Sequence, residues 1–506
     1  MMGDIRAPII GIVIISYLLS FFIHRTENFK APIVGRRSWL EPILLLRYRF
    51  LQNASSILAQ GYSQGKASMF KLLRADIDLL VVSNKYLNEL KAFPESELSF
   101  AHGLYRNFVG KYSMLQLTVD SSIMTKAVLS KLTPALHYFI PIMQKELEAA
   151  TSEETPECKD EWKEVDLMRL LNRITTRMSA HFIVGPDLCK NEAWLQASIK
   201  YTETAIPTGI ILRLFPTFLH PFIVHLLPVR WGAKHCVREA RRLIVPLVER
   251  RRKEQAESPQ GYVKPNDFVQ WMMDLAKIEN ESDPANIAHR ALIMSQASIP
   301  PAALTATQVL YDLCAYPEYI EPILEEAFAA IKEDGELSQK TLFRMRKLDS
   351  FMKESQRVNP PQLLSFQRYA AKSLTLSDGT HIPKGTQVCV AASSISADPQ
   401  IVHDPERFDG WRYYYKRLVP GEENRHQFSS IDTEWLHFGY GPHACPGRFF
   451  TANEVKMIVV HFLTKYELAF RPGEGRPKNQ VHDELVFPDL AARILIREKR
   501  VADTFK

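Results

Sequence analysis

The chain has 506 residues, 46% of them hydrophobic and 24% charged, with a formal net charge of +6. This composition supports a sizeable core and argues against disorder. Lys and Arg are spread along the chain instead of gathering in one stripe, so nothing indicates nucleic-acid binding. The six cysteines contain no C-x-x-C pair, which argues against a disulfide framework or a zinc ribbon and favours a reducing compartment.

The first 24 residues read as a membrane anchor. Residues 7–23 carry no charge, which is the short end of what spans a bilayer. Charged residues, and no small-residue cleavage site, follow the run, so an uncleaved anchor is favoured over a signal peptide. The excess of Lys and Arg after the run places the rest of the chain in the cytosol. We predict an anchor over 1–24, a linker over 25–40 and one large domain over 41–506, in a single-pass protein of the endoplasmic reticulum membrane.

A long helical pattern follows over residues 283–315, opened by an Asp-Pro pair that suits an N-cap and a first turn. Pro300 and Pro301 lie in its middle. Paired prolines remove two backbone hydrogen bonds, which leaves the carbonyls of Gln296 and Ala297 without partners and predicts a kink.

The next helical pattern, over 347–358, places Glu354 and Arg357 three residues apart, so their side chains can pair on one face. Helical stretches dominate from Ser130 to Arg357. Strand-like alternation is concentrated in residues 366–390 and after Pro488. We therefore expect a mainly α-helical fold with a small β-rich side.

The run Trp435-Leu-His-Phe-Gly-Tyr-Gly-Pro-His-Ala-Cys-Pro-Gly-Arg448 reads as a tight loop that leads into a helix. Pro446 suits the first helical position, which would put Cys445 where backbone N–H groups and the helix dipole stabilise a thiolate. Such a thiolate is a good axial ligand for heme iron. Two other interpretations are a buried apolar cysteine and a zinc site formed with His437 and His443.

The spacing of Phe438, Gly441, Cys445 and Gly447 matches the heme-binding signature of the cytochrome P-450 family. The E-x-x-R helix and the Pro-Glu-Arg-Phe408 segment precede it in the family's order, and the chain resembles the family over nearly its whole length. The resemblance implies the cytochrome P-450 fold, bound heme b and Cys445 as the axial ligand.

Further residue roles also rest on the resemblance. His443, which replaces the usual arginine, and Arg368 would contact the heme propionates. Glu354, Arg357 and Arg407 would form a buried structural triad.

The chain departs from the family in the central helix, where an acid or amide normally stands beside a threonine. We name Ser298 and Thr305 as candidates that hold ordered water and relay protons in its place. The alternative is that the proline pair only shapes the substrate pocket. The candidate pocket residues are Ile299, Pro300, Pro301, Leu363 and Leu364.

The activity implied by the resemblance is a monooxygenase that uses O2. Its electrons would come from NADPH through NADPH-cytochrome P-450 reductase, because the chain holds no flavin or nicotinamide motif. Residues 184–194 and 408–414 look like fungal members that oxidise terpenoids, which implies a hydrophobic terpenoid-type substrate. The alternatives are a heme-thiolate isomerase or dehydratase that needs no reductase, and a non-catalytic heme-binding protein.

Overall fold

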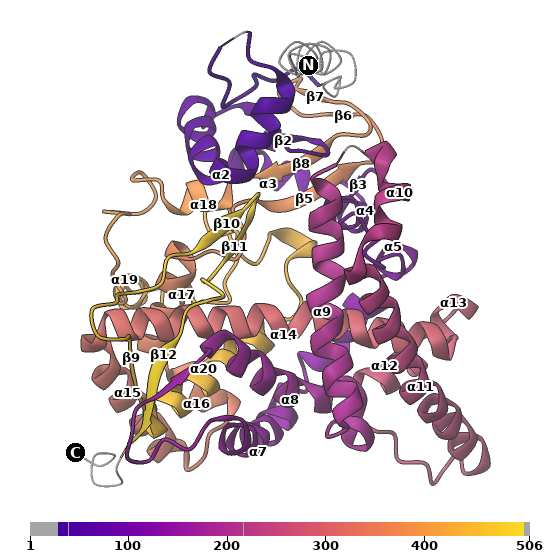
Figure 1. Cartoon of the computed structure of the whole chain (residues 1–506), viewed down its shortest axis with the longest axis vertical. Coiled ribbons are helices and arrows are strands. Elements are labelled where there is room, and N and C mark those ends of the chain that lie inside the picture. The colour runs from indigo at the N-terminus through magenta and orange to yellow at the C-terminus, as the bar shows by residue number, and fades with distance from the viewer. Residues whose placement is uncertain (1–28, 39, 216, 500–506) are drawn as a thin grey trace, which may run out of the picture.

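The computed structural model describes residues 29–38, 40–215 and 217–499, and helices form most of it (Figure 1). The predicted helical part, from Ser130 to Arg357, is a nearly continuous series of helices. They are α7 (Leu136–Glu154), α8 (Leu167–Leu188), α9 (Glu192–Arg213), α10 (His220–Leu226), α11 (Pro228–Glu257), α12 (Phe268–Leu275), α13 (Glu279–Ser282), α14 (Pro284–Ala315), α15 (Ile320–Asp334), α16 (Gln339–Arg344) and α17 (Arg346–Val358).

The other helices lie on either side of this series. They are α2 (Ile43–Gly65), α3 (Leu87–Leu90), α4 (Phe100–Asn107), α5 (Leu117–Asp120), α6 (Ile123–Ala127), α18 (Ala392–Ser396), α19 (Arg412–Lys416) and α20 (Arg448–Lys465). The mainly α-helical prediction is confirmed.

Helix α14 crosses the middle of the molecule and contacts α8, α9, α11, α17 and α20 (Figure 1). The Asp283 carboxylate caps it by accepting the Ala285 N–H at 3.0 Å, as predicted. The helical assignment continues through Pro300 and Pro301. The helix therefore supplies one long wall across the molecule.

The β-rich side is built around a five-stranded sheet in the order β1-β2-β8-β5-β3. Within it only β2 and β8 run parallel. Its strands are β1 (Met69–Leu73), β2 (Asp78–Val82), β3 (Leu98–Ser99), β5 (Ser365–Ala370) and β8 (Gln387–Val390). Three small sheets complete it: β4 (Lys163–Val165), β12 (Ile494–Glu498) and β9 (Tyr466–Ala469); β6 (Leu374–Thr375) and β7 (His381–Ile382); β10 (Gln480–His482) and β11 (Leu485–Phe487).

The predicted strand region 366–390 is confirmed, but β1, β2, β10 and β11 were not anticipated. Strand β2 is buried at every position and β1 at all but its first, so their sequences show no alternation of apolar and polar residues. Without that alternation a short apolar run cannot be told from a helical segment.

The predicted anchor lies outside the described residues, and in the part that is described no helix is long and apolar enough to cross a membrane. Packing begins within the predicted linker. Phe29 and Val34 are buried, and Ile33 pairs with Lys71 of β1. The domain therefore includes residues that we assigned to the linker.

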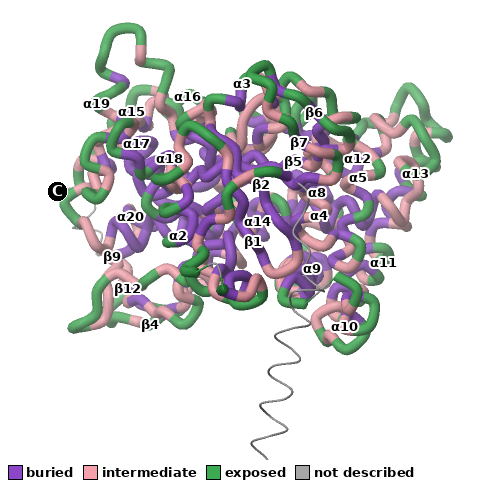
Figure 2. Tube along the Cα trace, turned by 90° about the horizontal axis from the view of Figure 1, so that it is seen from above, coloured by how far each residue is buried: buried purple, intermediate pink, exposed green. Residues whose placement is uncertain are grey.

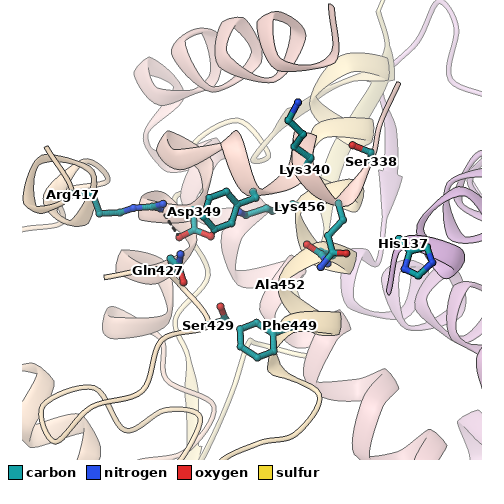
Figure 3. A pocket seen from close by; sticks show the side chains of 13 residues that line it. His137, Ser338, Lys340, Asp349, Arg417, Gln427, Ser429, Phe449, Ala452 and Lys456 are labelled. Atoms are coloured by element: carbon teal, nitrogen blue, oxygen red, sulfur yellow. Dashed lines mark hydrogen bonds and ion pairs between the residues drawn. The ribbon is translucent and has the colours of Figure 1, made fainter. Parts of the chain in front are cut away.

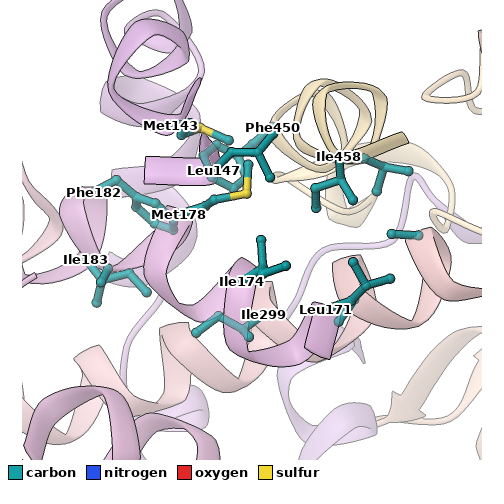
Figure 4. Packing of buried hydrophobic residues seen from close by; sticks show 14 of the residues in the cluster. Met143, Leu147, Leu171, Ile174, Met178, Phe182, Ile183, Ile299, Phe450 and Ile458 are labelled. Atoms are coloured by element: carbon teal, nitrogen blue, oxygen red, sulfur yellow. The ribbon is translucent and has the colours of Figure 1, made fainter. Parts of the chain in front are cut away.

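The largest hydrophobic cluster lies where α8, α14 and α20 meet. Figure 4 shows Ile299 of α14 beside Leu171 and Ile174 of α8. In Figure 2 the buried positions form the centre of the molecule and the exposed ones its outline. This packing fixes which face of α14 turns away from the core.

Gly185 allows a sharp bend near the end of α8. Its φ is +71°, and an added Cβ would lie 2.1 Å from Oδ2 of Asp267. Asp267 is buried and accepts two bonds from Arg251, at 2.8 and 2.7 Å. The bend thus brings the joint between α8 and α9 against a buried ion pair.

We expect Gly185→Ala to lower the free energy of unfolding by roughly 3 kcal/mol or more, because it combines backbone strain with displacement of a buried charge. Gly335→Ala is the matched control. Gly335 also has a positive φ, but its Cβ would meet nothing within 4 Å. The control should lose only about 1 kcal/mol. Urea denaturation followed by circular dichroism measures both, and equal losses would contradict the role of the Asp267 contact.

Candidate functional site

Cys445 lies in a loop that is held in place by its own backbone. Its N–H donates to the carbonyl oxygen of Phe438 at 2.7 Å. Burial raises the pKa of the Cys445 thiol, while the N–H groups of Gly447 and Arg448 and the Arg448 guanidinium oppose that rise. Helix α20 begins at Arg448, two residues later than the predicted start at Pro446. The N–H groups of Gly447 and Arg448 act on the thiol in the predicted direction, but burial outweighs them.

A cavity of about 880 Å³ lies against this loop. Apolar side chains form most of its walls, and the polar side chains include His102, Lys126 and Ser298. The apolar lining residues include Phe100, Met124, Val128, Leu132, Phe182, Ile293, Met294, Ala297 and Phe450. The volume falls within the usual range for small-molecule sites.

One short stretch of helix α14 is not buried by the rest of the protein. Between Ile287 and Leu313 every residue is buried except Ala297, Ser298, Pro300 and Pro301. Ala297 and Ser298 line the cavity, on the same side of α14 as Ile293 and Met294. A wall that is buried everywhere but there is suited to a ligand between α14 and the Cys445 loop.

Arg368 provides a buried positive charge near the edge of this cavity. Its guanidinium lies 4.1 Å from the Phe366 ring and 5.0 Å from the Phe100 ring, and Nη1 donates to the Gln367 carbonyl at 2.9 Å. Within the described ranges no carboxylate forms an ion pair with it, although the charge of Glu95 opposes the lowering of its pKa from a longer distance. Burial lowers the pKa of Arg368 to about 10. A buried cation without a carboxylate favours an anionic ligand.

His443 lies beside Arg368 and lines the cavity. Its ring stacks on Phe100 with 5.4 Å between centroids, and Nε2 is 3.2 Å from a carboxylate oxygen of Glu95. Burial lowers the pKa of His443, Arg368 lowers it further and Glu95 opposes them. The structure therefore brings together the two residues predicted to contact propionates.

These residues fit a heme. The set comprises a thiol at the edge of an apolar cavity, two nitrogen donors for carboxylates, and open space where a Cβ of Gly447 would stand. Gly441 has a φ of +74° and packs against Lys91. The zinc interpretation finds no support, because among the residues placed by the structure no group of three or more His, Cys, Asp or Glu could hold an ion.

The two proton-relay candidates differ in position. Ser298 lines the cavity, and its Oγ donates to the Met294 carbonyl at 2.9 Å. Thr305 is buried, donates to the Pro301 carbonyl at 2.8 Å and is not among the cavity-lining residues. The structure thus brings Ser298, but not Thr305, to the candidate site.

None of the five residues predicted to form the substrate pocket is among those that line the cavity. Ile299 packs into the core against α8, and Leu363 and Leu364 belong to a second cluster on the β-rich side. Pro300 and Pro301 are not fully buried. The side of α14 that lines the cavity is formed by residues 293, 294, 297 and 298. Sequence reasoning named Ser298 as a proton-relay candidate but did not place the other three at the cavity, because packing against α8 sets the helix phase.

The predicted charged triad is formed with one different member. The Arg357 guanidinium makes two bonds of 2.8 Å to the fully buried Glu354 carboxylate. The second guanidinium on Glu354 is that of Arg412, at 3.1 Å, and not that of Arg407. The Arg407 side chain is exposed, while its carbonyl oxygen accepts from Arg412 Nη2 at 2.9 Å.

Separate substitutions of Arg412 and of Arg407 test this assignment. Arg412→Gln should lower the free energy of unfolding by on the order of 2 kcal/mol, because a buried carboxylate loses a charged partner. Arg407→Gln should leave stability and heme content unchanged, because its side chain is in water. Thermal denaturation and the heme absorbance per protein measure both effects. The reverse ranking of the two variants would contradict the structure.

A second pocket, of about 560 Å³, lies on another face of α20 (Figure 3). The Asp349 carboxylate contacts Lys456 at 2.7 Å and Arg417 at 3.4 Å, so two cations surround one carboxylate. Phe343 and Phe449 line the same pocket and are exposed. Lys456 and Arg417 are buried against Asp349, so the exposed cation of this pocket is Lys340, which pairs with Asp334, and the two phenylalanines add apolar surface.

The chain has relatives in one family. The sequence model of the family described as Cytochrome P-450 matches residues 116–496. The cytochrome P-450 monooxygenase AN1598 of Emericella nidulans is 45% identical over 99% of this chain and 93% of that protein. The monooxygenase paxP of Penicillium paxilli is 39% identical over 96% and 94%, and an ent-kaurene oxidase of Fusarium fujikuroi is 37% identical over 96% and 92%.

The fold agrees with solved structures. The cytochrome P-450DA heme domain superposes with a TM-score of 0.68 at 16% identity, over 94% of this chain and 99% of that one. Because the family model spans well over half of the chain and the relatives align over nearly all of it, this chain belongs to the cytochrome P-450 family and is an oxidoreductase that carries heme b.

Proposed function

We propose that this chain is a monooxygenase in which Cys445 is the axial heme ligand and an apolar, terpenoid-type molecule is the substrate. The observation that carries the proposal is the apolar cavity that joins Cys445 to the partly exposed stretch of α14. The residues 1–24 would anchor it in the endoplasmic reticulum membrane, with the domain in the cytosol.

The chain's own residues bind and orient the cofactor. Cys445 would supply the sulfur ligand, Arg368 and His443 would bind the propionates, and the Phe438 carbonyl holds the Cys445 backbone in place. The bound heme supplies the chemistry of dioxygen activation and C–H oxidation. The protein provides a cavity from which apolar walls exclude water.

The walls favour a hydrocarbon-like substrate. Aromatic and aliphatic side chains from α4, α6 and α14 line the cavity, and removing apolar surface from water drives such binding. One relative is an ent-kaurene oxidase, and ent-kaurene is a polycyclic hydrocarbon. This agreement supports a polycyclic terpenoid for the present chain.

Electrons would reach the heme from NADPH through NADPH-cytochrome P-450 reductase. The second pocket supports this, because α20 begins three residues after Cys445 and carries the exposed Phe449 on the side that lines the pocket, and Lys340 adds an exposed cation to the lining (Figure 3). Positive charge near a binding surface speeds the encounter with an acidic partner.

The first test is spectroscopic. The reduced, CO-bound protein should show a Soret band well to the red of that of a histidine-ligated heme, and Cys445→Ala should abolish it. With reductase, NADPH and O2, a polycyclic hydrocarbon should gain one oxygen atom derived from O2, as mass spectrometry with labelled O2 would show. Turnover without reductase would favour the isomerase or dehydratase alternative, and a heme-loaded protein without any turnover would favour a non-catalytic role.

Proton delivery gives a separate test. We propose that Ser298 and the carbonyls freed by Pro300 and Pro301 hold the water that relays protons. Ser298→Ala should reduce product formed per NADPH consumed by about tenfold, since positioned proton transfer contributes a factor of that order or more. Pro301→Thr should change the same ratio, while Thr305→Ala, outside the cavity, should not. Unchanged coupling in Ser298→Ala and Pro301→Thr would leave the proline pair with a role in pocket shape only.

A further inference from the structure

A short loop joins α4 to α5, and both of these helices line the cavity beside Cys445. The loop comprises residues 108–116, and the lining residues include Phe100 of α4 and Thr118 of α5. The carbonyl oxygen of Leu115, near the end of the loop, accepts both the N–H and the hydroxyl of Thr118, at 3.0 and 2.7 Å. The conformation of the loop therefore determines where the α5 wall of the cavity lies.

The 108–116 loop has a backbone conformation that its residue types do not favour. Val109 has a φ of +51° and Met114 has a φ of +64°. A positive φ is uncommon for a residue other than glycine, and it is a genuine outlier for a β-branched residue such as valine. Such conformations persist only where the surrounding structure holds them, and they are enriched at functional sites. Contacts from outside the loop must therefore offset its strain.

Helix α9 packs on both ends of the loop. A Cβ added at Gly209 would overlap the carbonyl oxygen of Phe108, so α9 approaches the start of the loop too closely for a side chain. Eight residues earlier, on the same side of α9, the hydroxyl of Tyr201 lies 3.4 Å from the carbonyl oxygen of Met114. Tyr201 is fully buried, so the hydroxyl depends on protein groups for its hydrogen bonds.

Helix α14 reaches the same contact through His289. Its Nε2 lies 3.1 Å from the Tyr201 hydroxyl oxygen, and the two rings meet edge to face with 6.0 Å between centroids. Burial lowers the pKa of His289 to about 4, two arginines lower it further, and the Met114 carbonyl opposes this as a hydrogen-bond acceptor. The ring is therefore neutral at physiological pH, with one N–H to donate and one nitrogen to accept.

These three groups connect two walls of the cavity. His289 lies one turn before Ile293 on the same side of α14, and Ile293 lines the cavity. Met114 directly precedes Leu115, which holds Thr118 of the α5 wall. Tyr201 and His289 are not among the lining residues themselves, so they can affect a ligand only through the walls that they connect.

We propose that Tyr201 and His289 are positioning residues, which hold the 108–116 loop in its strained conformation and so determine which bulky ligands fit between α5 and α14. A small ligand that reaches only the iron should not sense the loop, whereas a ligand that fills the cavity should. The inference rests on the heme site of the proposed function, but on neither its substrate nor its reductase.

Two azoles of different size test this role on the full-length, heme-loaded enzyme. Imidazole and clotrimazole both bind heme iron through a nitrogen atom and shift the Soret band, but only clotrimazole carries a bulky triaryl group. Tyr201→Phe should raise the Kd of clotrimazole by about tenfold, because a buried carbonyl loses a donor and the wall has to be ordered again on binding. The Kd of imidazole should stay within about twofold of its value in the unmodified enzyme.

Hydrogen exchange measures the wall without any azole. In heme-loaded Tyr201→Phe, the amides of residues 114–122 should exchange about tenfold faster, because local opening of the loop costs less free energy. His289→Phe should give a similar increase in exchange and in the clotrimazole Kd, and it supplies the test if Tyr201→Phe fails to bind heme. The double variant should exceed the larger single effect by less than about twofold, because both side chains act at one carbonyl.

Tyr105→Phe is the matched control. It removes a hydroxyl from another tyrosine that packs on the same loop, since a Cβ added at Gly110 would overlap the Tyr105 ring. The Tyr105 hydroxyl, however, donates to the exposed side chain of Gln116 at 2.8 Å. The azole affinities and exchange rates of this variant should equal those of the unmodified enzyme.

Two results would overturn the positioning role. One is an unchanged clotrimazole Kd in Tyr201→Phe, and the other is faster exchange that spreads over the whole chain instead of residues 114–122. Absence of the imidazole shift in the unmodified enzyme would instead contradict the heme site itself, so failure of the positioning role and failure of the proposed function give different results.

Discussion

The rest of this structure depends on one constraint, which is that an apolar cavity has to accommodate negative charge. Burial raises the pKa of the Cys445 thiol, and a heme would bring two carboxylates to the same space. The backbone N–H groups of Gly447 and Arg448 and the buried Arg368 guanidinium can compensate this negative charge. These groups are poorly compensated in the protein alone, so cofactor binding should contribute directly to folding stability.

Charge compensation distinguishes the buried clusters of this chain from one another. Around Glu354 the donors are well matched: two guanidiniums and the Asp409 N–H bind the carboxylate, and backbone carbonyls accept the remaining Arg412 donors. Such a cluster joins α17 to the following loop without a need for a ligand. Arg368, in contrast, forms no ion pair with a carboxylate among the described residues, so it is suited to bind an anionic group of the cofactor.

Prediction from the sequence succeeded for contacts that a short motif specifies. The Cys445 loop, the Asp283 cap of α14 and the Glu354–Arg357 pair are contacts between residues close in the chain, and all are present in the structure. Arg407 entered the predicted triad through the resemblance to the family, and the irregular segment around it has no period that would show that Arg412 turns inward instead. Strands β1 and β2 were missed because burial on both faces removes their alternation.

The phase of α14 in the fold also decides which of its residues line the cavity, and the five predicted pocket residues are not among them. Packing of Ile299 against α8 turns Ala297 and Ser298 toward the cavity. Prolines at positions 300 and 301 have no N–H to offer the carbonyls of Gln296 and Ala297, so polar backbone oxygen stands at or beside an otherwise apolar wall. An unpaired carbonyl there favours ordered water. Pocket shape and proton delivery, which the sequence left as alternatives, would then be two consequences of the same missing hydrogen bonds.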